Sequence, residues 1–186
     1  NLSKQDEKIN LSVDIAEDSE LQSYVLLRGN PDQTVDTINT FKTNRFRIDT
    51  VDESVNPGKE IYHYHLAAVN SCGALTTRSD TLNNILLQVK KQNLNHILEW
   101  NDLENHSGLD IRYEIFRRIG DETEFFKKIG STYNPSYTDA EVESFRGKGR
   151  SAQFCYFIRA IIKQRNGYRS IVTSPVQCVY IEPKVF

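Results

Sequence analysis

Short runs in which apolar and polar residues alternate recur along this chain, and the runs of the second half repeat those of the first. The first series is INLSVDI, LQSYVLLRG, VDTINTF, FRIDTV and IYHYHLAAV. The second series is HILEWND, IRYEIFRRI, EFFKKIG, SYTDAEV, QFCYFIRAII and SPVQCVYI. Alternation with a period of two is typical of antiparallel strands that bury one face. The pattern therefore predicts two tandem copies of one all-β domain.

The spacing between matched residues sets the expected boundaries of the two copies. Tyr24 matches Tyr113 at an offset of 113 − 24 = 89, and Ala68 matches Ala160 at 160 − 68 = 92. Asp49 is matched to Asp139, an offset of 90. The growing offset indicates loop insertions in the second copy, chiefly GKGRSA. We expect domains at residues 1–83 and 84–186, with the first strand of the first domain truncated and ILLQVKK as the first strand of the second.

Composition agrees with a sheet protein. Tyr and Phe supply 9 residues each, and Met is absent. No apolar pattern with helical spacing persists for three turns, and the nearest segment, EVESFRGKGR, contains two glycines. Seven short strands in about 90 residues favour a β-sandwich of immunoglobulin-like architecture.

The segment NPGKEIYHYHLAAVN resembles the sixth strand (strand F) of fibronectin type III domains, with its Pro-Gly turn, aromatic residue, alternating apolar residues and Ala-Val. Trp100 stands where that family has its core tryptophan on strand B, a position that Val13 takes in the first copy, and Tyr113 matches the tyrosine of strand C. The resemblance implies two fibronectin type III-like sandwiches. The expected core residues are Tyr24, Phe46, Tyr62 and Tyr64 in the first copy and Trp100, Tyr113, Phe154 and Tyr156 in the second.

A narrower resemblance concerns function. The patterns SYxLxR, YTD and CYxxRA, a Cys in the last strand and the ending EPxVF are similar to repeats of bacterial gliding-motility-associated surface proteins. In those proteins a C-terminal sorting domain for type IX secretion follows. The resemblance implies a non-catalytic spacer or adhesion stalk of an exported cell-surface protein, whose partners are other proteins or surface glycans. The alternative is a carbohydrate- or protein-binding accessory domain of a secreted glycan-active enzyme, which would display aromatic side chains on one face.

Cys155 and Cys178 are expected on neighbouring strands, because strand G pairs with strand F in a fibronectin-like topology. Both are expected to point away from the core, within disulfide range. The matching positions of the first copy are His63 and, by the Ser79/Ser174 offset of 174 − 79 = 95, Asn83, so both cysteines are missing there together. This favours a Cys155–Cys178 disulfide and an oxidising, exported setting, over two separate thiols. Cys72 is left over, either as a free thiol or paired with residues upstream.

The sequence HYH at residues 63–65 raises the possibility of a metal site. A zinc site needs at least a third ligand, however, and no CxxC or HExxH accompanies His63 and His65. Alternation favours their exposure on the outer face of a strand, with His96 and His106 elsewhere in the second copy. No GxSxG and no glycine-rich phosphate loop occurs. We expect no metal, no cofactor and no catalysis.

Charge is nearly balanced, with 23 Lys+Arg against 25 Asp+Glu, which gives no general case for binding nucleic acid or an anionic membrane. The longest apolar run is far shorter than the roughly 20 residues of a membrane helix. One local anomaly is FRGKGR, where Arg146, Lys148 and Arg150, with Lys127 and Lys128, could form a basic patch for an acidic glycan or partner. The alternative is a loop that is merely solvated by its charges.

Overall fold

A computed structural model describes residues 8–15, 23–42, 46–103, 110–120, 124–146, 152–163 and 169–182. The chain divides into two compact units. Unit 1 contains residues 1–84 with 103–105, and unit 2 contains residues 85–102 with 106–186. Among the described residues, no helix is both long enough and apolar enough to cross a membrane.

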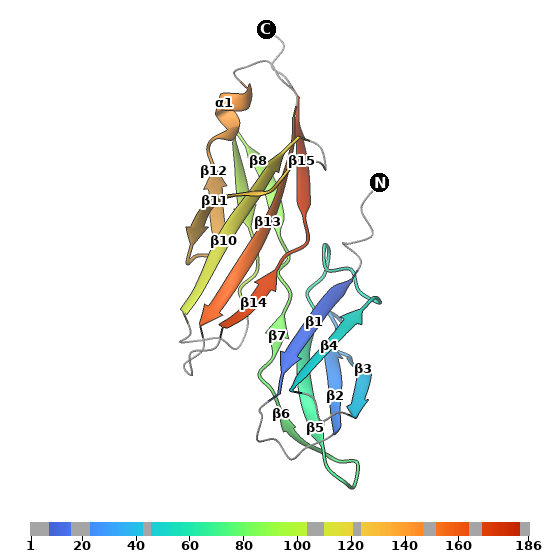
Figure 1. Cartoon of the computed structure of the whole chain (residues 1–186). Helices are drawn as coiled ribbons and strands as arrows, with labels where there is room; N and C mark the ends of the chain where they lie inside the picture. The colour runs from blue at the N-terminus through green and yellow to red at the C-terminus, as the bar shows by residue number, and fades with distance from the viewer. Residues whose placement is uncertain are drawn as a thin grey trace. The chain divides into compact units, whose positions relative to one another are not determined.

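Unit 1 is built from two antiparallel sheets (Figure 1). The first pairs β1 (Ile9–Asp14) with β4 (Arg47–Asp52). The second is five-stranded, in the order β3-β2-β5-β6 with β7 also paired to β5. Its strands are β2 (Ser23–Gly29), β3 (Val35–Lys42), β5 (His63–Val69), β6 (Leu75–Arg78) and β7 (Leu82–Asn83).

Unit 2 repeats this plan with a more complete first sheet, in the order β12-β9-β8. The strands of that sheet are β8 (Gln88–Gln92), β9 (Asn95–Glu99) and β12 (Ser136–Asp139). The second sheet has the order β11-β10-β13-β14, and β15 also pairs with β13. Its strands are β10 (Asp110–Ile119), β11 (Lys127–Thr132), β13 (Ala152–Lys163), β14 (Arg169–Thr173) and β15 (Gln177–Ile181).

This strand order is that of the fibronectin type III sandwich, in which strands A, B and E form one sheet and strands C′, C, F and G form the other. The predicted fold class, two immunoglobulin-like β-sandwiches in tandem, is therefore correct. Strand A of unit 2 begins at Gln88, three residues after the start of the predicted segment ILLQVKK. The predicted strand SYTDAEV ends at Asp139, and a short helix, α1 (Val142–Arg146), follows it.

Seven of the eight predicted core aromatic residues are buried. Tyr24, Tyr62 and Tyr64 are each 5% exposed, and Phe154 and Tyr156 are fully buried. Trp100 packs edge-on against Tyr113 with 5.2 Å between ring centroids.

Phe46 is the exception, because it is 56% exposed. Ile48 fills the corresponding core position and is 5% exposed. Phe46 has the same parity as Ile48 but precedes β4, where strand alternation no longer fixes the direction of a side chain. Its backbone carbonyl accepts a hydrogen bond from Ile15 N at 2.7 Å.

Candidate functional site

A buried cluster of Asp52, Tyr64 and Arg28 joins the two sheets of unit 1. The Tyr64 hydroxyl donates to Asp52 Oδ2 at 2.9 Å, and Arg28 Nη1 donates to the same oxygen at 2.8 Å. The other oxygen, Oδ1, accepts from Ser54 N at 3.0 Å and from Ser54 Oγ at 2.8 Å. Asp52 ends β4, whereas Arg28 and Tyr64 come from β2 and β5 of the facing sheet. The carboxylate therefore holds the two sheets together.

The same cluster recurs in unit 2. Tyr156 donates its hydroxyl hydrogen to Asp139 Oδ2 at 2.8 Å, and Arg117 Nη1 lies 2.8 Å from both oxygens of that carboxylate. The backbone N–H of Glu141 donates to Asp139 Oδ1 at 3.2 Å. Arg117 Nη2 also donates to Glu141 Oε2 at 2.6 Å. Asp139 again ends the strand of one sheet, and the other two residues again come from the facing sheet.

These clusters correct the sequence alignment of the two copies. The structural equivalent of Asp139 is Asp52, at an offset of 139 − 52 = 87. Asp52 is opposite Ile9 on β1 and Asp139 is opposite His96 on β9, and these two partners have the same offset, 96 − 9 = 87. Asp49, the residue matched to Asp139 by sequence, has a 67% exposed side chain paired with Arg47. Strand alternation in the sequence could have shown this, because Ile48 points inward, so that Asp49 must point outward and Asp52 inward. A buried polar cluster therefore recurs between the two copies.

The surroundings of these groups suit structure rather than proton transfer. Burial alone would raise the pKa of Asp52, but hydrogen bonds from Ser54, Arg28 and Tyr64 outweigh it and lower that pKa. Burial, and then the neighbouring carboxylate, raises the pKa of Tyr64 and of Tyr156. Both phenols therefore keep their hydrogen at neutral pH. With its oxygens occupied by donors and only 2% of its surface exposed, Asp52 is poorly placed to act as a base on a substrate.

The lowered pKa of Asp52 predicts a pH dependence for unit 1. A carboxyl group whose pKa is lower in the folded state stabilises the fold above its unfolded pKa of about 3.9, and this contribution is lost as pH falls through the folded value. We expect the free energy of unfolding of unit 1 to decrease below about pH 4. Urea unfolding between pH 5 and pH 2.5 measures it. Asp52→Asn should show a shallower decrease than the wild type, and identical slopes would contradict this role for Asp52.

His96 extends the cluster in unit 2 only. Its Nδ1 lies 2.8 Å from the Tyr156 hydroxyl oxygen, and the residue is 1% exposed. Because the single hydroxyl hydrogen goes to Asp139, Nδ1 must carry the hydrogen of its bond to Tyr156. Ile9 occupies the corresponding position of unit 1. His96 is thus a core residue with a satisfied polar contact to Tyr156.

A second recurring feature is a serine that divides the last strand of each unit. Ser79 Oγ accepts from Leu66 N at 2.9 Å, and Ser79 N donates to Leu66 O at 2.8 Å. Ser174 makes the same pair of bonds with Ile158, at 3.0 and 2.9 Å. The serines lie between β6 and β7 and between β14 and β15. The sequence offset that matched Ser79 to Ser174 is therefore structurally meaningful.

Cys155 and Cys178 form a disulfide with an S–S distance of 2.04 Å. They are directly opposite each other on β13 and β15, just as His63 is opposite Asn83 on β5 and β7. Cys155 points away from the core, as expected, yet it is fully buried, with Arg118 Nη2 3.8 Å from its sulfur. Cys178 is exposed.

Cys72 is a free, exposed thiol in the turn between β5 and β6. The side-chain oxygen of Asn70 accepts from Cys72 N at 3.0 Å and from Ala74 N at 2.9 Å, which shapes this turn.

Loss of the disulfide should destabilise unit 2. A bridge that closes a loop with a sequence separation of 23 stabilises a fold by about 3 kcal/mol in the chain-entropy account. We expect the double variant Cys155→Ala, Cys178→Ala to lower the unfolding free energy of unit 2 by about that amount. Tryptophan fluorescence during chemical denaturation follows it, since Trp100 belongs to unit 2. Cys72→Ala serves as the control, and an equal loss there would contradict the assignment.

The other predicted site residues are not gathered into one site. His63 and His65 are half-buried on the outer side of β5, and burial, followed by Arg78, lowers the pKa of His65. Within the described ranges, no three His, Cys, Asp or Glu residues are grouped so that they could hold a metal. His106, Lys148 and Arg150 lie outside the described residues, and Arg146 ends α1. The basic patch of residues 146–150 stays a prediction.

Comparisons with known proteins found similarity to solved structures but not to a protein family or a curated protein. No model of a protein family matches the chain, and no curated protein matches it. A crystal structure of selenomethionine-substituted chicken interferon gamma receptor alpha chain is similar, with 12% sequence identity and a TM-score of 0.36. The alignment covers 89% of this chain and 88% of the receptor chain. The strand order and register of each unit define its fold.

Proposed function

We propose that this chain is a non-catalytic interaction and spacing module of an exported bacterial cell-surface protein. The observation that carries the proposal is the Cys155–Cys178 disulfide, because structural disulfides persist in oxidising compartments. The finer assignment, a stalk of a gliding-motility-associated protein exported by type IX secretion, rests on the resemblance of the SYxLxR, YTD and CYxxRA patterns.

The polar clusters described above support the non-catalytic part of this proposal. In both units the phenol and the guanidinium each donate to the carboxylate across the sandwich interior. Groups that satisfy each other inside a fold stabilise it and leave little capacity for a substrate.

The alternative, a carbohydrate-binding accessory domain with an aromatic platform, requires exposed rings aligned on one face. Trp100 is only 7% exposed and packs in the core. The most exposed described aromatic residues are Phe125, Tyr133, Phe46 and Tyr180, of which Phe46 belongs to unit 1 and the others come from three different segments of unit 2. An aromatic sugar platform is therefore the weaker proposal.

Cys72 provides a direct test of export, because it is exposed and unpaired whereas the other two cysteines are bonded to each other. Intact cells that make the protein are treated with a membrane-impermeant maleimide, and the protein is then recovered for peptide mass spectrometry. We expect label on Cys72 and a disulfide-linked Cys155–Cys178 peptide. The Cys72→Ser variant is the control and should carry no label. Label that appears only after lysis, with Cys155 and Cys178 reduced, would refute export.

A further inference from the structure

The outer face of the β11-β10-β13-β14 sheet in unit 2 carries an unusual set of side chains. Figure 1 shows this sheet in front of β8, so its outer face is turned to the viewer. Along β10, Tyr113 and Ile115 are buried in the core, so the alternate residues 110, 112, 114, 116 and 118 point outward. On β13 the core residues are 154, 156, 158, 160 and 162, which leaves the odd-numbered positions on the outer face.

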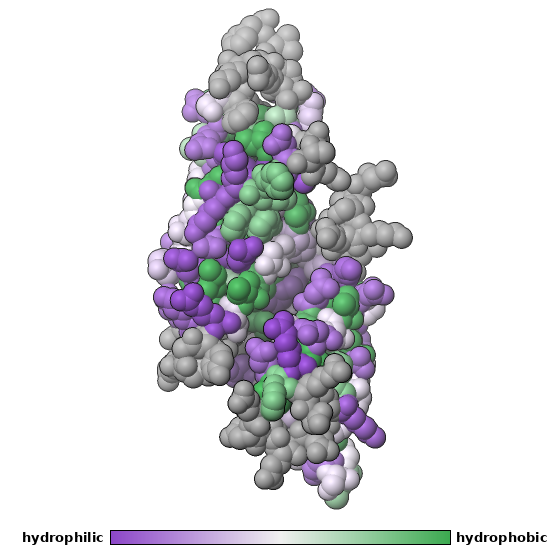
Figure 2. All heavy atoms as spheres, viewed as in Figure 1, coloured by the Kyte–Doolittle hydropathy of each residue, from purple (hydrophilic) through white to green (hydrophobic). Residues whose placement is uncertain are grey.

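This outer face is strongly basic, and we refer to it as the basic face. The outward positions of its four strands carry two carboxylates, Asp110 and Glu114. They carry six basic side chains, namely Arg112, Arg118, Lys128, Arg159, Lys163 and Arg169. The formal sum is 6 − 2 = +4, although the whole chain has a net charge of −2. Figure 2 shows hydrophilic and hydrophobic side chains intermingled over this sheet.

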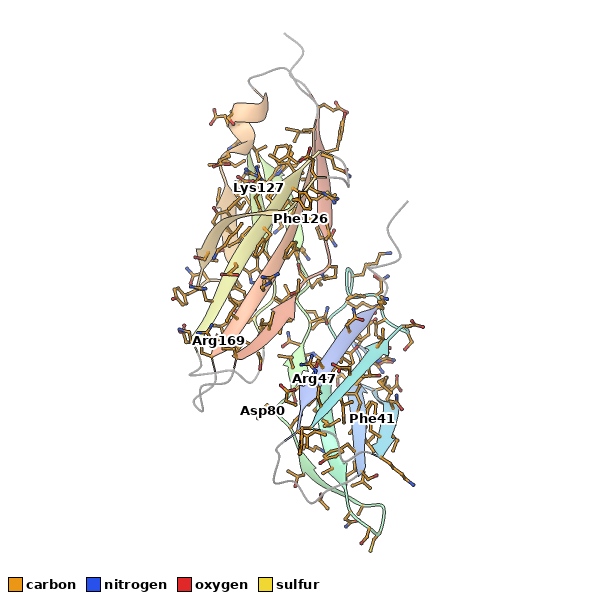
Figure 3. All side chains as sticks on the ribbon, in the orientation of Figure 1. Phe41, Arg47, Asp80, Phe126, Lys127 and Arg169 are labelled. Carbon is orange, nitrogen blue, oxygen red and sulfur yellow. A yellow bond between two sulfur atoms is a disulfide. The ribbon has the colours of Figure 1, made fainter. Side chains whose placement is uncertain are left out.

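Three aromatic rings stand in a row across the basic face, with an arginine at each end. Phe116 and Phe157 are stacked with 4.6 Å between centroids and 5° between planes, and Phe126 meets Phe157 edge-on at 4.9 Å. The guanidinium carbon of Arg159 lies 4.9 Å from the Phe116 centroid, and that of Arg118 lies 4.9 Å from the Phe126 centroid. Figure 3 labels Phe126 and Arg169 toward opposite ends of the sheet.

The row favours an anion electrostatically. Phe116 and Phe157 are directly opposite each other on β10 and β13, and the 4.6 Å between their ring centroids matches the spacing of neighbouring strands. Aromatic rings are negative on their faces and positive at their edges. Here the Arg159 and Arg118 guanidinium groups and the neighbouring rings lie against these rings, so the negative ring faces are offset by positive charge. A carboxylate or sulfate oxygen approaching the face therefore meets positive potential.

The two carboxylates of the face neutralise only part of this charge. Glu114 accepts from Arg112 at 3.1 Å and from Lys128 at 2.6 Å, and Asp110 pairs with Lys163 at 3.1 Å. These three basic side chains still have 45%, 43% and 58% of their surfaces exposed. The Asp110–Lys163 pair is exposed at both ends and remains open to exchange with a solution anion, because such a pair contributes little on its own, whereas the side chain of Glu114 is only 11% exposed.

Unit 1 shows that this charge is not a requirement of the fold. The outward residues of β2 are Ser23, Val25, Leu27 and Gly29, and those of β5 are His63, His65, Ala67 and Val69. No Lys, Arg, Asp or Glu stands among these described positions of its two central strands. The same two strands of unit 2 carry Asp110, Arg112, Glu114, Arg118, Arg159 and Lys163.

We propose that the basic face binds a linear acidic polysaccharide, laid along the strands so that its carboxylates or sulfates meet successive basic residues. β13 has 12 residues, which corresponds to about 40 Å of extended strand. Its two outward basic residues, Arg159 and Lys163, are four residues or about 14 Å apart, so the cations are spread along the face rather than gathered in a pocket. The choice of a polysaccharide rests on the proposed function, because export places the face among surface polysaccharides.

The test is a binding titration of purified protein with fluorescently labelled polygalacturonate, with dextran as the neutral polymer. Wild-type protein should bind polygalacturonate more weakly as salt rises, because the attraction is electrostatic, and should not bind dextran. The triple variant Arg112→Gln, Arg159→Gln, Arg169→Gln should lose at least tenfold in affinity. A matched control in unit 1, Lys42→Gln, Arg47→Gln, Lys59→Gln, removes the same charge and should change affinity by less than twofold.

A milder variant, Lys163→Gln with Arg169→Gln, changes only exposed side chains and should lose at least threefold. This double variant tests the basic face if the triple variant does not fold. Absent binding by the wild type, or equal losses in the face and control variants, would overturn the proposal. Tighter binding of poly-glutamate or double-stranded DNA than of polygalacturonate would overturn it too. Because the titration uses purified protein, its failure is distinguishable from failure of the maleimide test of export.

Discussion

Replacement of Trp100 by alanine is expected to unfold unit 2 under conditions in which unit 1 stays folded. Trp100 is 7% exposed and packs edge-on against Tyr113, so truncation removes a large buried ring and leaves a cavity. Substitutions of this kind cost about 3–5 kcal/mol, which is a large part of the stability of a domain of this size. In chemical denaturation followed by circular dichroism, the variant should show a transition of unit 2 at a lower denaturant concentration than the wild type.

A control separates loss of the indole from general damage. Tyr133→Ala, in the same unit, removes an aromatic ring that is 67% exposed, and it should leave the transition of unit 2 in place. If Trp100→Ala shifts the unfolding of both units to the same extent, the two sandwiches are not independent.

The second large effect is expected at Asp52. Removing its carboxylate by Asp52→Ala leaves the buried Arg28 guanidinium with only the half-exposed Asp36 as an ion-pair partner and the Tyr64 hydroxyl without its acceptor. Breaking a buried ion pair from one side costs about 3–5 kcal/mol, because the remaining charge stays desolvated. Urea unfolding of unit 1 should shift accordingly.

Asp49→Ala is a matched control for this substitution. Asp49 lies on the same strand, three residues away, and its side chain is exposed beside Arg47. We expect no resolvable change in stability there, since exposed ion pairs contribute little. Equal effects at Asp49 and Asp52 would contradict the buried cluster and would restore the sequence-based match of Asp49 to Asp139.

The alternation of apolar and polar residues predicted much of the fold, because every second residue of a strand points to the same side. Tyr62 and Tyr64 point inward and His63 and His65 outward, as predicted. The pairing of Cys155 with Cys178 could also be predicted from the sequence. Once strands F and G are taken as neighbours, the matching positions of the first copy, His63 and Asn83, are opposite each other in the same way.

The features that the sequence did not predict depend on contacts between strands or on where a strand ends. The aromatic row of the basic face requires the register of β10 against β13 and the placement of Phe126 beside Phe157, neither of which one strand encodes. Asp52 was missed because similar letters in RIDT and YTDA suggested Asp49 instead. Phe46 was misplaced because the end of a strand is poorly defined by its pattern, so alternation was extended one residue too far.

Native-state hydrogen exchange on the full chain tests the central claim, that two separate sandwiches are each held by their own core and clusters. The amides of Leu66 and Ile158 are matched reporters, because each donates to the serine that divides the last strand of its unit. Exchange is compared before and after reduction of the disulfide. We predict that protection of Ile158 falls while that of Leu66 is unchanged. A parallel fall at both amides would show one cooperative structure and contradict the claim.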